Sequence, residues 1–310
     1  MDVLKIIANQ IKDLKALESS AFLDQIYNHL ERAELYYNNG LIDGHFFNDV
    51  VYRTNQAFEG SIKEAYKVLG EKTDEETLRI TPYNIEKFFK ENNIFKERVL
   101  KLFENYRKEW RNESTHDYSL ILDENEAFLA LVNVTSFVHL LLKQTQEKVS
   151  YNRVFQKPTS ASLKQDVEAI KASIYSLSER VISFIKLFNK EELTPDLNES
   201  QMMGMLYAFL VKSDDSLLVS REPSISNEFI NIRPDFIIAS QEESIILEVR
   251  RLSHLNDHAS VQQVARYLEL TGITKGIVYM FTTNVSKTEL NATFQSISKN
   301  DNTFEIAVIR

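Results

Sequence analysis

Glycine and proline are rare in this chain of 310 residues, and their scarcity limits the possible folds more than any other feature. Only seven glycines and five prolines occur, whereas average usage is about 7% glycine and about 5% proline. Both residues interrupt helices, so we expect a mostly helical protein. The seven glycines form neither GxGxxG nor GxxxxGK[ST]. The sequence therefore offers no support for a Rossmann dinucleotide site or a P-loop.

Cysteine is absent from the chain, and this excludes several classes of site. Disulfides, thiol nucleophiles and cysteine-ligated zinc or iron–sulfur centres cannot form. The first twenty residues alternate charged and apolar positions and lack the uninterrupted apolar core of a signal peptide. The sequence also shows no uninterrupted apolar run of membrane-spanning length. We therefore expect no membrane span and a soluble, cytoplasmic protein.

The formal net charge of −9 argues against nucleic-acid binding through bulk charge. One segment departs from this acidity, because residues 151–190 hold seven Lys or Arg against three Asp or Glu. This segment is the best candidate for a local contact with nucleic acid. The alternative interpretation is a solvated helix face.

Hydrophobic periodicity predicts an N-terminal helical domain over residues 1–150. Apolar residues recur at helical spacing in four segments, at 2–37, 46–70, 83–111 and 124–145. The last segment is apolar nearly all round and is preceded by the capping pair Asp123 and Glu126. A helix of that kind belongs at the centre of a bundle or at an interface.

A second domain is predicted over residues 195–310, after a connecting segment at 151–194. The polar stretch 146–160 indicates the boundary, and a helix of about 165–190 follows as a connector or a dimerising stalk. Beyond it the periodicity changes to that of a mixed domain. Helices are predicted at 198–212 and 258–271, and strands at 216–221, 229–239, 244–251, 276–283 and 304–309. The predicted fold class is therefore a helical bundle followed by an α/β domain.

A first candidate site lies between Arg111 and His116, with Asn112 beside the arginine. In a continuous helix Asn112 and His116 would share a face. Histidine transfers protons near neutral pH, and arginine neutralises a phosphorane-like transition state by bidentate contact. Together they suit metal-independent RNA cleavage, in which the neighbouring 2′-hydroxyl attacks. The alternative is a helix-end cap and a packed histidine.

The segment RNESTHDY, with the helix DENEAFLALVNVTSFVHLLL after it, resembles the HEPN superfamily of helical nuclease domains. FNDVVYRTNQAFEGSIKEAYKVL also resembles the second helix of such domains. The resemblance covers about residues 1–150 and implies a homodimer with a composite site. By position it implies that Arg111 stabilises phosphate, Asn112 is its polar partner and His116 is the acid/base. Many HEPN domains only bind or dimerise, so activity is not implied by the fold alone.

A second candidate site lies in a predicted hairpin. The run IRPDFII enters one strand through Pro234 and Asp235, and IILEVRR supplies its partner with Glu248 and Arg250. Because hairpin strands pair directly, Asp235 and Glu248 can approach one another. Paired carboxylates suit Mg²⁺, which prefers oxygen ligands, activates water and stabilises a pentavalent phosphate. The alternative is an ordinary hairpin with an ion pair between Glu248 and an arginine.

This arrangement is similar to the PD-(D/E)XK nuclease superfamily over about residues 195–310. The helix ESQMMGMLYAFL before the strands and QQVARYL after them also fit that family. The resemblance implies a restriction-endonuclease-like fold, with Asp235 and Glu248 as metal ligands, Glu199 as an extra acid and Gln263 as a phosphate or water contact. Arg250 stands where the family has lysine. Arginine keeps the charge but does not readily exchange a proton.

Some basic and histidine residues are open alternatives. Lys275 and Arg251 are conceivable substitutes for the missing lysine. His254 and His258 could join a metal site, but the start of the 258–271 helix is the simpler location for them.

Three functions follow from these patterns. The first is a HEPN-type, metal-independent endoribonuclease whose C-terminal domain binds or senses nucleic acid, as in bacterial defence or toxin systems. The second is a Mg²⁺-dependent DNA endonuclease with the helical domain as dimeriser. The third is a nucleic-acid-binding protein that cuts nothing. The intact Arg111–His116 motif, against the lysine-to-arginine change at position 250, favours the first.

Overall fold

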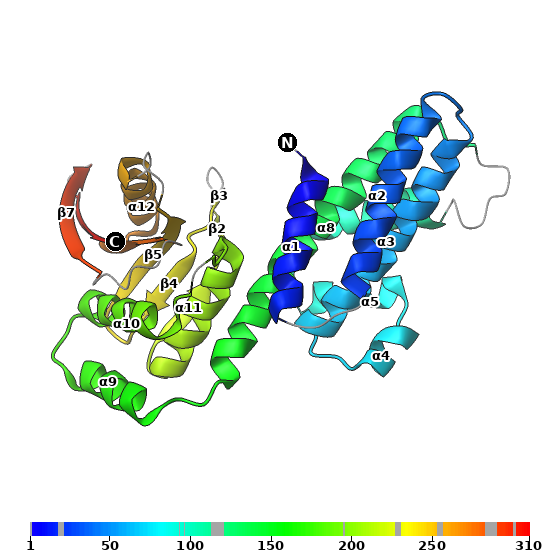
Figure 1. Ribbon diagram of the computed structural model, residues 1–310. Coiled ribbons are helices and arrows are strands. Elements are labelled where there is room, and N and C mark those ends of the chain that lie inside the picture. Colours follow the sequence, from blue (N-terminus) through cyan, green and yellow to red (C-terminus); the bar gives the residue numbers. More distant parts are fainter. Residues whose placement is uncertain are drawn as a thin grey trace. The chain divides into compact units, whose positions relative to one another are not determined.

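A computed structural model describes residues 2–17, 22–92, 94–95, 97–112, 121–194, 196–226, 231–252, 257–282, 290–299 and 302–310. Its internal contacts divide the chain into two compact units, Met1–Val149 and Ser150–Arg310. The first unit is helical. The second combines helices with a mixed β-sheet. Figure 1 shows the helices and strands of both units, coloured along the sequence.

The N-terminal unit is a bundle of helices (Figure 1). They are α1 (Val3–Leu17), α2 (Phe22–Gly40), α3 (Phe46–Leu69), α4 (Asp74–Arg79), α5 (Pro82–Glu91), α6 (Glu97–Tyr106), a π-helical segment η1 (Arg107–Asn112) and α8 (Glu124–Gln156). The single helix predicted over 2–37 was wrong, because α1 and α2 are separate. As two separate helices, α1 and α2 both place their apolar residues in the same core of the bundle.

Aromatic side chains from distant helices fill the centre of this bundle. Phe58 of α3 is fully buried and lies 5.0 Å from Phe103, 4.8 Å from Tyr106 and 5.5 Å from Phe137, measured between ring centroids. The buried Tyr106 hydroxyl satisfies its hydrogen bonds with Thr54 Oγ1 at 2.8 Å and Asn55 Oδ1 at 2.7 Å. Apolar packing therefore joins α3, α6 and α8, and the buried hydrogen bonds of Tyr106 join α6 to α3.

Helix α8 is longer than predicted and runs through the expected domain boundary. It continues to Gln156, so the polar stretch that begins at residue 146 does not end it. Among the described helices it is the one long and apolar enough to cross a membrane by length and composition. It also supplies buried residues to the bundle, including Ala130, Val134 and Val138. The core helix of a bundle has the same composition.

Two helices replace the connecting helix predicted at about 165–190. They are α9 (Ala161–Ala172) and α10 (Leu177–Glu192). Ser176 ends the gap between them, because its side chain accepts a hydrogen bond from Glu179 N while Glu179 reaches back to Ser176 N. This capping box starts a new helix. Both helices pack into the core of the C-terminal unit, so neither is a free connector or stalk.

The C-terminal sheet has six strands in the order β1-β4-β5-β6-β8-β7. Its strands are β1 (Leu218–Arg221), β4 (Phe236–Ala239), β5 (Ser244–Arg251), β6 (Lys275–Phe281), β7 (Ala292–Lys299) and β8 (Asn302–Ile309), and β2 (Ile225–Ser226) pairs separately with β3 (Asn231–Ile232). β4 and β5 form the predicted antiparallel hairpin, whereas β5 and β6 are parallel and joined through α12 (Asp257–Thr271). The edge strand β7 was not predicted.

Helices cover both faces of this sheet (Figure 1). One face packs with α10 and α11 (Glu199–Ser213), where Phe236, Leu247 and Tyr279 are buried. The other packs with α12, where Ile246 and Val278 contact the apolar side of that helix. Since side chains alternate along a strand, Glu248 and Arg250 share the α12 face with Ile246.

Candidate functional site

Asp235 and Glu248 meet where strand β4 begins. Phe236 pairs with Leu247 in the β4–β5 register, and Asp235 directly precedes that pair opposite Glu248. The backbone N–H of Asp235 donates to Glu248 Oε1 at 3.0 Å, and the N–H of Val249 donates to Asp235 Oδ2 at 2.8 Å. Each carboxylate thus receives a backbone hydrogen bond from the other strand, which holds the two acids together.

Arg250 lies against both carboxylates. Its Nη1 donates to Asp235 Oδ2 at 3.2 Å and to the Val249 carbonyl at 3.0 Å. Its Nη2 donates to Glu248 Oε2 and, at 3.3 Å, to Gln263 Oε1. The expected alternative of an ion pair between Glu248 and an arginine is therefore present, and the arginine is Arg250.

Helix α12 completes this cluster from above the sheet face. Gln263 accepts from Arg250, while its Nε2 donates to the Tyr267 hydroxyl at 2.6 Å. Gln263 and Tyr267 are four residues apart and so lie on one side of the helix. Tyr267 was not among the predicted site residues, although its spacing from Gln263 could have indicated it.

Burial dominates the electrostatics of the two acids. The Glu248 side chain is 1% exposed and that of Asp235 is 18% exposed. Burial, then the charge of Asp235, raises the pKa of Glu248 to about 8, although Arg250 opposes the shift. Burial also raises the pKa of Asp235, against the hydrogen bond from Val249 N and the charge of Arg250. Paired, desolvated carboxylates beside one cation are a common feature of functional sites.

Two further acids act on Asp235 at longer range. The charges of Glu199, the first residue of α11, and of Glu222 both raise the pKa of Asp235. Glu222 also donates its backbone N–H to the Asp235 carbonyl at 2.8 Å. Within the described ranges, no three His, Asp or Glu side chains gather closely enough to hold one cation. The role of Glu199 as a third metal ligand remains a prediction.

The structure does not support the other suggested residues near this site. Lys275 pairs in register with Ile245, three residues before Glu248 on β5, and its Nζ contacts Glu243 Oε1 at 2.9 Å. Arg251 follows Arg250 in the strand, so alternation directs it to the other sheet face. His258 is an exposed residue in the first turn of α12. His254 lies outside the described residues.

The first candidate site falls largely outside the part of the chain that the structure describes. Arg111 and Asn112 end the π-helical segment η1. His116 lies outside the described residues. Short π-helical turns occur often at functional sites.

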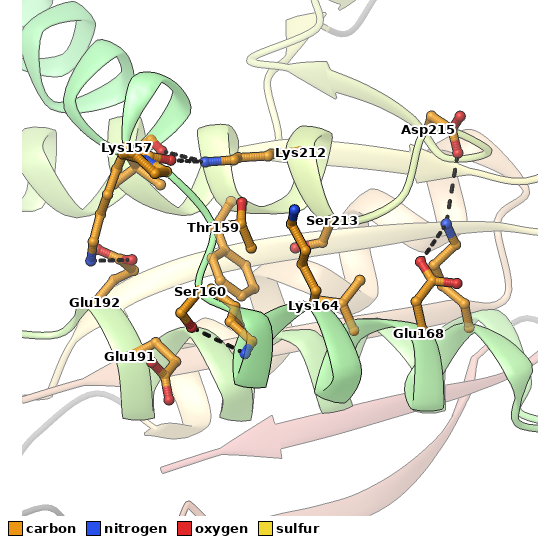
Figure 2. Close-up of a pocket in the computed structure, with 16 residues that line it drawn as sticks. Lys157, Thr159, Ser160, Lys164, Glu168, Glu191, Glu192, Lys212, Ser213 and Asp215 are labelled. Atoms are coloured by element: carbon orange, nitrogen blue, oxygen red, sulfur yellow. Dashed lines mark hydrogen bonds and ion pairs between the residues drawn. The ribbon is translucent and has the colours of Figure 1, made fainter.

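The basic stretch at 151–190 contributes to a cavity of about 540 Å³ in the C-terminal unit (Figure 2). Acids line it beside the lysines. Lys157 pairs with Glu192 at 2.8 Å, and Lys171 lies 3.3 Å from Glu168. Lys212 Nζ donates to the backbone carbonyl of Val154 at 3.2 Å, near the end of α8. These contacts favour the interpretation as a solvated, internally paired surface over a basic strip for phosphate.

Comparison with known families supports the second site. Residues 213–292 match the family model for the PD-(D/E)XK nuclease superfamily, and this range contains Asp235, Glu248, Arg250 and Gln263. The C-terminal unit is therefore similar to the PD-(D/E)XK nuclease superfamily over this range. No match to a HEPN family was found for the N-terminal unit. No curated protein is similar enough to the chain to count as a match.

Proposed function

We propose that this protein is a nuclease that cuts nucleic acid, with duplex DNA as substrate, at the Asp235–Glu248 site of its C-terminal unit. The observation that carries the proposal is the pair of buried carboxylates, joined by reciprocal backbone hydrogen bonds inside the segment that matches the nuclease superfamily. Such a site can place charged groups around a phosphodiester. Because it is partly shielded from water, their electrostatic effect on the phosphate is stronger.

The donor set fits a divalent cation of the Mg²⁺ type. Asp235 and Glu248 offer carboxylate oxygens, and the Val249 carbonyl faces the same guanidinium as they do. Hard cations prefer oxygen ligands of these kinds. When bound there, such an ion would supply a charge that activates water and stabilises the phosphate transition state.

The chain's own residues have separate parts in this proposal. Asp235 and Glu248 hold the cation, Arg250 orients and neutralises phosphate, and Gln263 contacts phosphate or water. Arginine suits the phosphate role because its planar fork matches two phosphate oxygens at once. It is poorly suited to proton exchange, so the attacking water must lose its proton to another group.

The test uses the full-length protein with labelled duplex DNA and labelled single-stranded RNA, each with Mg²⁺ and with EDTA. We expect DNA cutting that needs Mg²⁺, is lost in Asp235→Asn and is kept in Glu305→Gln. Glu305 is an exposed carboxylate on β8 and serves as the matched control. DNA cutting at an unchanged rate in Asp235→Asn would refute this assignment.

A second candidate function is a HEPN-type ribonuclease in the N-terminal unit. Its support is the helical bundle, together with the placement of Arg111 and Asn112 at the end of the π-helical segment η1. In this proposal Arg111 stabilises phosphate and His116 transfers the proton without a metal. RNA cutting that survives EDTA and disappears in His116→Ala would establish it, whereas RNA cutting abolished by EDTA would contradict it.

The same proposal includes a homodimer formed through the helical unit. Helix α8 exposes Phe128, Leu129 and Val132, each more than 40% accessible, along one stretch. Exposed apolar groups of this kind occur at protein interfaces. Sedimentation of the Val132→Glu variant as a monomer, against a dimer for the unaltered chain, is the expected result.

The resemblance to defence and toxin nucleases supports a cytoplasmic role against phage or self nucleic acid.

A further inference from the structure

We propose that the Arg250 guanidinium occupies the cation position of the site, so that a divalent ion binds only when this side chain leaves. The inference rests on the metal-dependent function proposed above. It concerns the protein without nucleic acid. It goes beyond that function because Arg250 competes with the metal ion for the carboxylates, in addition to contacting phosphate.

The contacts of Arg250 carry the inference. The guanidinium touches Asp235 Oδ2, Glu248 Oε2 and the Val249 carbonyl. These are the three oxygens that fit a hard cation, and they come from both strands of the hairpin. A guanidinium that engages all three lies where a metal ion bound to the same oxygens would lie, so the two compete for this position.

Charge makes the two occupants exclusive. The Glu248 side chain is almost wholly buried, so the ionised form of the acid pair needs a cation close to it. Arg250 provides one positive charge in the structure. A divalent ion at the same oxygens would lie within a few ångströms of that guanidinium, where repulsion between like charges is strong. The site therefore holds one of the two cations at a time.

Helix α12 holds the Arg250 guanidinium at the cation position. Gln263 Oε1 accepts from Arg250 Nη2, and the Tyr267 hydroxyl fixes the other end of the same amide. Gln263 is thus a positioning residue for the guanidinium. Lysine could not reproduce this arrangement, because its single ammonium lacks the planar fork that spans two carboxylates and an amide.

The side chain also has a way out. Arg250 is 30% exposed, whereas Glu248 beneath it is 1% exposed. A nucleic-acid phosphate that approached from solvent would offer the guanidinium a bidentate partner. Phosphate binding would then free the carboxylates, and metal binding and nucleic-acid binding would strengthen one another, as linkage requires.

The test measures Mn²⁺ binding by calorimetry and by electron paramagnetic resonance on the full-length protein, without nucleic acid. The proteins are the unaltered chain, Arg250→Met, Arg250→Lys and the control Arg266→Met, which removes an exposed arginine from α12. We expect Arg250→Met to bind Mn²⁺ about 10- to 100-fold more tightly than the unaltered chain, since charged hydrogen bonds are worth that ratio. Arg250→Lys should lie between, and Arg266→Met should match the unaltered chain.

Equal affinity in the unaltered chain and both Arg250 variants would overturn the proposal, as would the absence of Mn²⁺ binding from all of them. If Arg250→Met does not fold, Arg250→Lys still decides. A second readout is the guanidinium Nε–H resonance of Arg250, assigned by its loss in Arg250→Lys. Saturating Mg²⁺ should shift it and speed its exchange with water, and an unchanged resonance would count against the proposal.

These outcomes are separable from the proposed function. Cleavage that does not depend on Asp235 refutes the nuclease assignment. The Mn²⁺ affinities still decide whether Arg250 competes with a cation. Equal Mn²⁺ affinities refute this competition, even where Asp235-dependent cleavage is observed.

Discussion

Raising the pH should lower the stability of the sheet around β5, and Glu248→Gln should remove most of this pH dependence. Burial and Asp235 raise the pKa of Glu248 from its ordinary 4.5 to about 8. Between these values the folded protein keeps a proton that the unfolded chain has lost. Stability from this group is therefore fully present below about pH 4.5 and is lost as the pH rises toward 8.

The magnitude follows from the size of the shift. One pKa unit corresponds to about 1.4 kcal/mol, so a shift from 4.5 to about 8 sets a ceiling of ~5 kcal/mol. The side chain is nearly inaccessible, which leaves little solvent screening to reduce this value. We expect a loss of a few kcal/mol across the window in the unaltered chain and a much flatter profile in Glu248→Gln.

Hydrogen exchange of the β5 amides measures this loss locally, in EDTA at pH 5 and pH 8. Comparing the two proteins at one pH cancels the intrinsic exchange rate. It also cancels the contributions of His29 and His139, whose pKa values burial lowers. Glu305→Gln, on an exposed part of β8, is the control and should follow the unaltered chain. Parallel loss of protection in the unaltered chain and Glu248→Gln would refute the reasoning.

Three other predictions test the fold and the site. Gly276→Ala should destabilise the C-terminal unit by about 1–3 kcal/mol in urea unfolding, because the added Cβ would lie 2.5 Å from Val264 Cγ1; unchanged stability would show that α12 moves away freely. Phe58→Ala should lower the stability of the helical unit by about 3–5 kcal/mol, followed by circular dichroism, since the ring is fully buried among aromatic neighbours; a loss below about 1 kcal/mol would contradict the central packing. Tyr267→Phe removes the acceptor of Gln263 Nε2 and should raise Mn²⁺ affinity a few-fold, whereas Tyr83→Phe, on an exposed face of the helical unit, should leave it unchanged; equal affinity in both would show that Gln263 does not hold Arg250.

Local patterns predicted most elements of the C-terminal unit. The strands β4, β5 and β6 and the helix α12 were found because their apolar residues are buried and keep a regular period. The edge strand β7 was missed for the opposite reason. Most of its residues are exposed, so it lacks the apolar alternation by which strands are recognised.

The breaks between helices were the main errors in the helical predictions. The apolar period continues across residues 173–176, and the prediction followed it, although the Ser176–Glu179 capping box was present in the sequence. Likewise, the predicted helix ended at residue 145, while α8 continues to Gln156. Helix ends depend on caps and on tertiary packing as much as on periodicity.

For the candidate site, the sequence alone determined that Asp235 and Glu248 would face one another, because hairpin pairing follows from local order. It also showed arginine at position 250. Only the tertiary structure decided where that arginine points. Its contacts with both carboxylates, the Val249 carbonyl and Gln263 combine two strands and a helix from across the crossover. The ion pair with Glu248 was an alternative that the sequence offered, since residues two apart in a strand share a face. The contacts with Asp235 and Gln263 come from other elements, and no local pattern records them.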